Sequence, residues 1–165
     1  MLIRKRSSGD GLVLLRGLLL TFSIAILLVG LVVVVLETSA EPFGSVPELP
    51  AALCLMCAGA VTLVLPPYLV RPLPCDSESE LSKGYVQRFF LRIAFAESAA
   101  LLAFVVFIVT GAGWLYLVGA GFTAVGFVRL APTATHLAKE QDELRRAGCT
   151  RSLVAALRQH PLGRP

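Results

Sequence analysis

The chain has 165 residues, of which 56% are hydrophobic and 16% charged, and its mean hydropathy is +0.76. A soluble globular chain is nearer a quarter charged, so a soluble core does not account for this composition, whereas a lipid-facing surface does. The net charge of +4 does not indicate a nucleic-acid partner, because the basic residues flank apolar spans. Arginine outnumbers lysine 12 to 3, which suggests a GC-rich bacterial genome.

The first apolar run follows a basic N-terminal stretch and predicts a transmembrane helix over residues 12–36. Leu18 to Leu36 contains no charge for 19 residues, and about 20 apolar residues span a bilayer core. The run is longer than the apolar region of a signal peptide. Glu37-Thr38-Ser39-Ala40 is a weak cleavage site, but we interpret the segment as an uncleaved first helix.

A second apolar run predicts a span over residues 49–70. Pro66-Pro67 is expected to break or kink its last turn, because proline cannot continue a helix normally. A polar loop follows, and its Ser77-x-x-Glu80 sequence is a capping-box pattern. We therefore expect a helix to begin there and to run into a third span over residues 87–110.

The 31 residues from Ser98 to Val128 contain no charge. One helix of that length would measure about 46 Å, longer than a single span needs. Gly111-Ala112-Gly113 is a natural break, and Trp114 after it suits a membrane interface. The run therefore predicts the end of the third span and a short fourth span over residues 114–130.

The distribution of positive charge predicts the orientation of these spans. With four spans and the N-terminus inside, all 15 Lys and Arg residues fall in cytoplasmic segments or at cytoplasmic helix ends, and the two outer loops contain none. This satisfies the positive-inside rule. We expect an all-α integral membrane four-helix bundle, N-in and C-in, in the bacterial cytoplasmic membrane. Residues 1–131 would form the transmembrane domain and residues 132–165 a cytoplasmic tail.

The tail is predicted to be helical and amphipathic. Residues 133–147 indicate a helix ended by Gly148, and residues 150–159 indicate a second, shorter one. So short a segment cannot form an independent core without metal or disulfide. Basic residues beside its apolar stripes favour binding of the tail to an anionic lipid surface. The alternatives are that the tail packs against a partner protein or is solvated. The candidate lipid contacts are Arg145, Arg146, Arg151 and Arg158.

Glu97 is the candidate functional residue within the spans. It lies about eight residues inside the third span, which is about 12 Å of depth. A carboxylate there costs about 3 kcal/mol, so it must take up a proton, meet a partner or face a polar cavity. We expect a proton or ion site, a contact with another subunit, or a structural tie. The possible ties are to Arg16, Arg92, Thr62 and Ser23.

Residues 94–106, AFAESAALLAFVV, resemble the carboxylate-bearing helix of rotary ATP synthase subunit c. The resemblance implies an ion-binding role for Glu97. The Gly-rich first helix of that family is absent from Leu12 to Leu36 and the long tail is foreign to it, so we assign no rotor function. In size and architecture the chain also resembles small uncharacterised four-helix membrane proteins of high-GC bacteria. In some mycobacterial assemblies such proteins are accessory subunits, for instance of lipid importers.

The fourth span carries small residues that are expected to form a helix-packing face. Small residues allow the backbones of neighbouring membrane helices to approach closely. The face would pack within this chain's own bundle or dock a partner subunit. Its members are Gly119, Ala120, Gly121, Ala124 and Gly126.

The cysteines and histidines do not indicate a catalytic or metal site. Cys54-x-x-Cys57 has redox or metal spacing, but it lies in an apolar helix, where cysteine behaves as a small hydrophobe. Cys75 and Cys149 fall in predicted cytoplasmic segments, where a disulfide is not expected. His136 and His160 are expected at the surface. We expect no catalytic residue, cofactor or metal.

These observations predict that the chain is a non-catalytic accessory subunit of a larger membrane complex. That complex is either a transporter or a respiratory assembly. The alternative is a small transporter or ion-conducting protein that uses Glu97. A membrane enzyme is the third class, and no cluster of convergent polar residues favours it. The expected partners are the bilayer and either another integral membrane protein or further copies of this chain.

Overall fold

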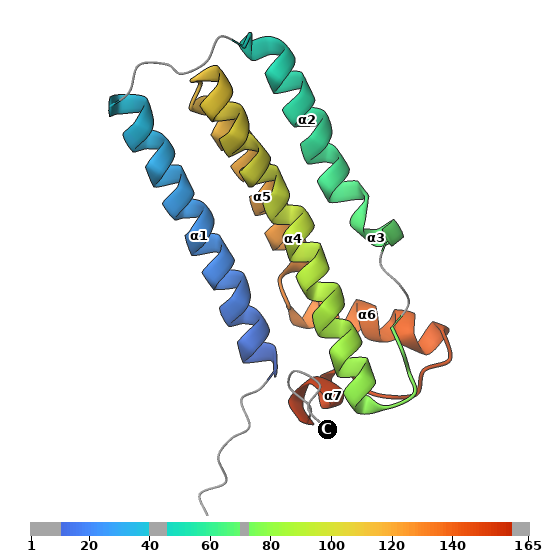
Figure 1. Cartoon of the computed structure of the whole chain (residues 1–165). Coiled ribbons are helices and arrows are strands. Elements are labelled where there is room, and N and C mark those ends of the chain that lie inside the picture. The colour runs from blue at the N-terminus through green and yellow to red at the C-terminus, as the bar shows by residue number, and fades with distance from the viewer. Residues whose placement is uncertain (1–10, 40–45, 70–72, 160–165) are drawn as a thin grey trace, which may run out of the picture. The chain divides into compact units, whose positions relative to one another are not determined.

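The structure is a computed structural model that describes residues 11–39, 46–69 and 73–159. Within these ranges the secondary structure is entirely helical, with no strand, which confirms the all-α prediction. The helices are α1 (Gly11–Ser39), α2 (Glu48–Val64), α3 (Pro66–Leu69), α4 (Glu78–Thr110), α5 (Trp114–Leu130), α6 (Ala134–Arg146) and α7 (Leu153–Gln159), as labelled in Figure 1.

The ends of α4 follow local signals in the sequence. The backbone N–H of Glu80 donates to Ser77 Oγ at 3.1 Å, so the capping pattern is used. The helix then continues without a break to Thr110, as expected. Gly111 has a φ of 73°, a left-handed conformation that glycine adopts readily and that commonly ends helices. The predicted break before α5 is therefore confirmed.

Proline and glycine also set the other helix ends. α2 stops at Val64 and α3 begins at Pro66, which confirms the break at the proline pair. After α6, Gly148 has a φ of 86°, and the N–H of Cys149 donates to the Leu144 carbonyl at 2.9 Å. This is the hydrogen bonding of a glycine-terminated helix, so the predicted end of α6 is confirmed.

The chain divides into two compact units, each described here by itself. Unit 1 comprises residues 1–18, 71–90 and 131–165, and unit 2 comprises residues 19–70 and 91–130. Thirteen of the 15 Lys and Arg residues belong to unit 1. The chain is therefore partitioned into a basic, polar unit and an apolar one.

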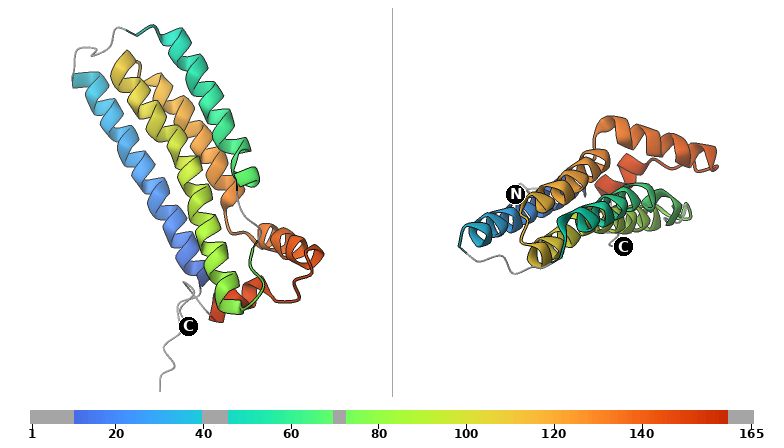
Figure 2. Two further views of the ribbon diagram at one scale, coloured as in Figure 1. Left: turned by 45° about the vertical axis from the view of Figure 1, so that its right-hand side comes forward. Right: turned by 90° about the horizontal axis from the view of Figure 1, so that it is seen from above.

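Unit 2 is arranged around α5, beside which parts of α1 and α4 and the whole of α2 run lengthwise (Figure 1). The Tyr116 hydroxyl of α5 donates to the Ile26 carbonyl of α1 at 2.6 Å. On another side, α2 packs along α5 (Figure 2). There a Cβ added to Gly59 would lie 2.5 Å from the Phe122 ring. The buried cluster of unit 2 consists of Val33, Leu55, Ala100, Ala103, Phe107, Ala112, Leu115 and Tyr116.

The first turns of α2 and α5 are joined by a polar contact at one end of unit 2. The indole N–H of Trp114 donates to the Glu48 carboxylate at 3.0 Å. Glu37, at the end of α1, lies at the same place, because a Cβ added to Gly113 would overlap its carboxylate. An indole with an exposed polar edge is typical of a membrane interface.

Within the described part of the chain, two helices, α1 and α4, are long and apolar enough to cross a membrane, and the number is three if α5 and α6 count as one broken span. α2 is a shorter apolar helix. In the apolar window of α1 only 6% of residues are buried, against 39% in α4. A helix that is apolar on nearly all sides and this exposed has the character of a membrane segment.

Unit 1 buries the apolar stripes of the tail. Leu153 and Leu157 of α7 are fully buried, and so is Leu81 in the first turns of α4. Tyr85 and Phe89 continue the buried side of α4 at helical spacing. These apolar side chains of the tail are thus buried in the structure. The other buried tail residues are Leu137, Leu144, Cys149 and Ala156.

Candidate functional site

Glu97 lies on α4 in unit 2, at the border between the buried and the exposed face of the helix. Its neighbour Ala100 is buried, Ala94 is exposed, and Leu101 is 50% exposed. The Glu97 side chain itself is half-buried. Among the residues that the structure describes, its carboxylate has no hydrogen bond or ion pair.

The hydroxyl groups expected as partners of Glu97 are used elsewhere in unit 2. Ser23 donates to the Leu19 carbonyl and Thr62 to the Gly59 carbonyl, both at 2.8 Å. Each bond closes within its own helix, so neither proton is directed at a carboxylate. The Ser23 and Thr62 hydroxyls therefore do not donate hydrogen bonds to the Glu97 carboxylate.

The buried part of the predicted small-residue face packs against α4. A Cβ added to Gly119 would overlap the Ala103 Cβ, and one added to Gly126 would be 2.7 Å from the Ala96 Cβ. Close approach of two helix backbones requires such residues. Gly119 and Gly126 thus serve packing within the chain itself.

The other members of the predicted face point elsewhere. Gly121 has open space around it and is exposed. Ala124 is also exposed, and Ala120 is half-buried. The structure therefore does not bring the five small residues onto one face of α5. Those that point outward are available to lipid or to a partner.

Thr123 is the member of this contact that sequence reasoning missed. Its Oγ1 is 2.8 Å from the Ala96 carbonyl and 3.1 Å from the Gly119 carbonyl, and it accepts from the Ala100 N–H at 3.1 Å. The side chain is 1% exposed. The signal was present as the spacing of Gly119, Thr123 and Gly126, which places all three on one side of a helix.

The basic residues of the tail have different surroundings in unit 1. Arg145 and Arg146 are exposed and present their charge outward. The Arg151 guanidinium donates to the Asp76 carbonyl at 2.8 Å. The Arg158 side chain lies outside the described residues. Of the candidate lipid contacts, two are therefore displayed at the surface and one is used to hold unit 1 together.

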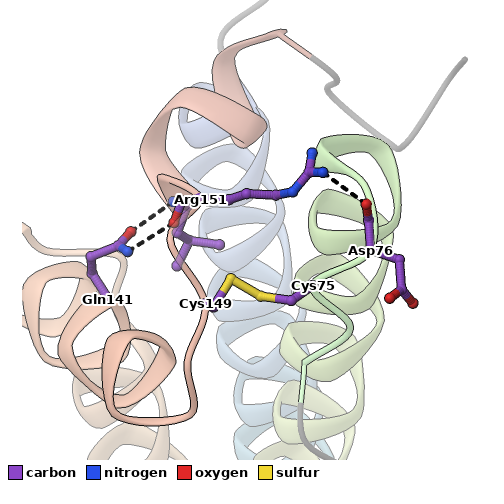
Figure 3. Close-up of a disulfide and its surroundings, with 6 residues drawn as sticks. Cys75, Asp76, Gln141, Cys149 and Arg151 are labelled. Carbon is purple, nitrogen blue, oxygen red and sulfur yellow. Dashed lines mark hydrogen bonds between the residues drawn. A yellow bond between two sulfur atoms is a disulfide. The ribbon is translucent and has the colours of Figure 1, made fainter.

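Gln141 joins α6 to the beginning of α7, as the dashed lines in Figure 3 show. Its Nε2 donates to the Arg151 carbonyl at 2.9 Å, and its Oε1 accepts from the Leu153 N–H at 2.7 Å. Both ends of the amide are used. The connection between the two tail helices is therefore held by specific hydrogen bonds rather than by apolar contact alone.

A disulfide joins Cys75 to Cys149 within unit 1 (Figure 3). Their Cα atoms are 5.9 Å apart although 74 residues separate them in sequence. Our expectation that these cysteines form no disulfide is wrong for this structure. It rested on the compartment, whereas the bond depends on the tail returning to the segment before α4. Nothing in the sequence around these two distant cysteines indicates that the tail returns to the segment before α4.

The other cysteines and the histidines considered in the sequence analysis are not part of the contacts described above. Cys54 and Cys57 are free and exposed on α2. His136 is exposed on α6, and His160 lies outside the described residues. Within residues 11–39, 46–69 and 73–159, no group of three or more His, Cys, Asp or Glu residues is placed to hold a metal ion.

Comparison of the chain with protein-family models, with curated proteins and with solved structures gives no match.

Proposed function

We propose that the chain is an integral membrane protein that serves as a non-catalytic accessory subunit and docks through α4 onto a larger membrane assembly. The observation that carries the proposal is the half-buried Glu97 carboxylate, which borders an exposed apolar face and has no partner among the described residues. An ionised carboxylate facing lipid costs about 3 kcal/mol. A hydrogen-bond donor from another chain removes that cost, so this part of α4 is the docking contact.

Four spans are supported by the lengths of the apolar segments. α1 has no charge from Gly17 to Leu36, and α4 has only Glu97 from Ile93 to Thr110. α2 and α5 have 17 residues each, which is about 26 Å of helix at about 1.5 Å per residue. The hydrocarbon core is about 30 Å thick. Both shorter helices therefore nearly match it, and α2 gains a further turn from α3.

An N-in and C-in orientation is supported by the polarity of unit 2. Glu37, Glu48 and Trp114 gather at one end of the unit. Its two basic residues, Arg92 and Arg129, lie together away from that group, beside Pro66 at the start of α3. Positive residues favour the cytoplasmic side, and unit 1 holds the other thirteen.

The assembly we propose is a transporter, such as a lipid importer, or a respiratory complex of the bacterial cytoplasmic membrane. This choice follows the likeness in size and architecture to small accessory membrane proteins of high-GC bacteria. The exposed apolar surface of α1 is consistent with a subunit that meets both lipid and protein.

A second candidate function is ion or proton transport through Glu97, and the intramembrane carboxylate itself is the observation that favours it. A conducting path also needs polar groups that line it. Ser98 donates to the Phe95 carbonyl at 2.7 Å and Thr110 to the Val106 carbonyl at 2.8 Å. Because these hydroxyls bond back to their own helix, they favour the accessory function.

Substitution of Glu97 tests the proposal. The tagged chain is recovered from membranes in mild detergent, and co-purifying membrane proteins are quantified by mass spectrometry. If Glu97 accepts a hydrogen bond from a partner, Glu97→Leu should lower partner recovery by roughly tenfold, the effect of about 1.4 kcal/mol. Glu97→Gln, which retains an acceptor, should keep most of it. Ser98→Ala is the matched control on the same exposed side and should change nothing.

Two results would redirect the proposal. Equal partner recovery with Glu97→Leu and the native chain contradicts docking through Glu97. Normal recovery together with loss of the assembly's transport in Glu97→Gln would favour the transport function, because an amide cannot carry a proton.

A further inference from the structure

The segment that carries Cys75 is positioned in unit 1 by its packing on α4. A Cβ added to Gly84 of α4 would lie 2.7 Å from Pro74 Cδ and 3.5 Å from Leu73 Cδ2. The two residues before Cys75 therefore lie against the helix, and glycine at position 84 leaves room for them. The place of Cys75 thus does not depend on the disulfide alone.

The segment that carries Cys149 is held by hydrogen bonds on both sides of the cysteine. The Cys149 N–H donates to the Leu144 carbonyl at 2.9 Å, which fixes the cysteine at the end of α6. Two residues later, the Arg151 guanidinium donates to the Asp76 carbonyl at 2.8 Å (Figure 3). Asp76 directly follows Cys75, so this hydrogen bond holds the same two segments that the disulfide joins.

The two cysteines of the bond differ in their access to solvent. Cys75 is partly exposed, whereas Cys149 is only 5% exposed. Thiol–disulfide exchange requires a thiolate to reach one sulfur of the bond, and access decides which sulfur it attacks. An external thiolate therefore meets Cys75 first. The hydrogen bond beside it keeps the two segments together once the disulfide is open, which favours its formation again.

We propose that Cys75 and Cys149 form a reversible thiol switch. In the oxidised state the bond locks the connection between α6 and α7 to the segment before α4. In the reduced state only the non-covalent contacts hold that connection. This inference concerns unit 1 and depends on neither Glu97 nor the accessory role, although the N-in and C-in orientation proposed above is what exposes unit 1 to the thiols of the cytoplasm.

The reductant that fits the switch is a dithiol protein of the thioredoxin class. One of its thiolates bonds to the Cys75 sulfur, the bond between Cys75 and Cys149 breaks, and Cys149 leaves as a thiolate that takes up a proton. The second thiol of the reductant then displaces Cys75, which also becomes a thiol. Two electrons have passed to the chain, and the reductant has become a disulfide. Oxidised glutathione reverses the reaction and is itself reduced to two thiols.

The hydrogen bonds of Gln141 report the state of the switch. Its Oε1 accepts from the N–H of Leu153, the first residue of α7, at 2.7 Å, and its Nε2 donates to the Arg151 carbonyl at 2.9 Å. The Leu153 side chain is fully buried. Because the disulfide closes a loop of about 74 residues, its reduction allows this part of the tail to open more often.

Hydrogen exchange of the purified full chain in a neutral detergent tests the switch. Thioredoxin, kept reduced by its reductase, should open the disulfide without denaturant. Exchange of the Leu153 N–H should then speed up, by up to roughly a thousandfold on the loop-entropy model. Subsequent addition of oxidised glutathione should restore the original rate, which distinguishes a switch from irreversible loss of structure.

A titration of the same chain in glutathione buffers tests the part played by the neighbouring hydrogen bond. Arg151→Gln removes the guanidinium that donates to Asp76, so the equilibrium constant for closing the disulfide should fall roughly threefold, the effect of one partly solvated hydrogen bond. The matched control is Arg145→Gln. Arg145 makes an ion pair with Asp142 on its own helix, and its replacement should leave the constant unchanged.

Three results would overturn the switch. The first is a native chain whose disulfide thioredoxin reduces only after denaturation, because the bond would then be a permanent crosslink. The second is equal exchange of the Leu153 N–H in the oxidised and the reduced chain. The third is an equal closing constant for Arg151→Gln and Arg145→Gln. A chain that passes all three tests but recovers no partner from membranes would contradict only the proposed function, so the two failures are distinguishable.

Discussion

Unit 1 and unit 2 are stabilised by different means. In unit 2, Gly119 and Gly126 make close contacts with alanines of α4, and one hydroxyl, that of Thr123, bonds across the same interface. In unit 1 a disulfide joins segments 74 residues apart. The Gln141 amide and the Arg151 guanidinium add bonds to backbone carbonyls.

The difference follows from the environment proposed for each unit. Apolar burial gives little driving force between helices in lipid, so close packing of small residues has to supply the attraction. Unit 1 consists of short segments at a polar surface, which bury too little apolar area to be stable alone. A crosslink and specific polar contacts compensate for that shortage. The two units should therefore respond to different substitutions.

Removal of the disulfide should give the largest effect, and unit 1 alone should show it. By the loop-entropy model, a bridge closing about 74 residues contributes about 4 kcal/mol at most. Cys75→Ser with Cys149→Ser should therefore speed amide hydrogen exchange in α6 and α7 by up to roughly a thousandfold. Exchange in α5 should not change.

The matched control is Cys54→Ser with Cys57→Ser, which replaces the two free thiols of α2. This variant should leave exchange in α6 and α7 as it is in the native chain. If exchange in α5 rises as much as exchange in α6 when the disulfide is removed, the separation into two differently stabilised units is wrong.

Overpacking of the α4–α5 contact should give the next largest effect, confined to unit 2. Gly119→Val places methyl groups where Ala103 and the Ala99 carbonyl already lie, and overpacking of this kind costs about 3 kcal/mol. Denaturant unfolding of the purified chain, followed by circular dichroism, measures the loss. The Cys75–Cys149 bond should still form, as a non-reducing gel would show.

Gly121→Val is the control for this substitution, because no atom lies within 4 Å of the Cβ it would add. It makes the same chemical change two residues away on α5. The free energy of unfolding should stay within about 0.5 kcal/mol of the native value. Equal destabilisation by Gly119→Val and Gly121→Val would show that helix propensity matters here and that the close approach does not.

The sequence predicted the local features of the fold because the signals for them are local. Ser77 and Glu80 start α4, Gly111 ends it, and Gly148 ends α6. Each of these depends on a few consecutive residues and on backbone conformation. The location of Glu97 at the border between the buried and the exposed face of α4 could not be predicted in this way, because the periodicity of polar residues along α4 is weak where nearly every residue is apolar.

The features that sequence reasoning missed depend on contacts between distant segments. The disulfide requires the tail to return to Cys75, and nothing near either cysteine indicates it. Arg92 was expected only as a marker of orientation or as a partner of Glu97, and its position beside Arg129 at one pocket requires knowing how α4 and α5 are paired. The bonding of Thr123 to α4 likewise requires knowing which helix faces α5.

The orientation of the chain is the central claim, because the compartment that unit 1 faces and the chemistry of its disulfide both depend on it. In the N-in and C-in orientation, unit 1 faces the cytoplasm, where thiols are kept reduced. The Cys75–Cys149 pair should then be open in growing cells and close on oxidation. In the opposite orientation the pair would stay closed.

Cysteine accessibility in intact cells tests this claim most directly. In a chain with all four native cysteines replaced by serine, single cysteines are placed at Val46, before α2, and at His136 on α6, two exposed positions. A membrane-impermeant maleimide should label the Val46→Cys chain in intact cells. The His136→Cys chain should be labelled only after the cells are permeabilised. Labelling of His136→Cys in intact cells, with Val46→Cys protected, would contradict the orientation and place unit 1 outside the cell.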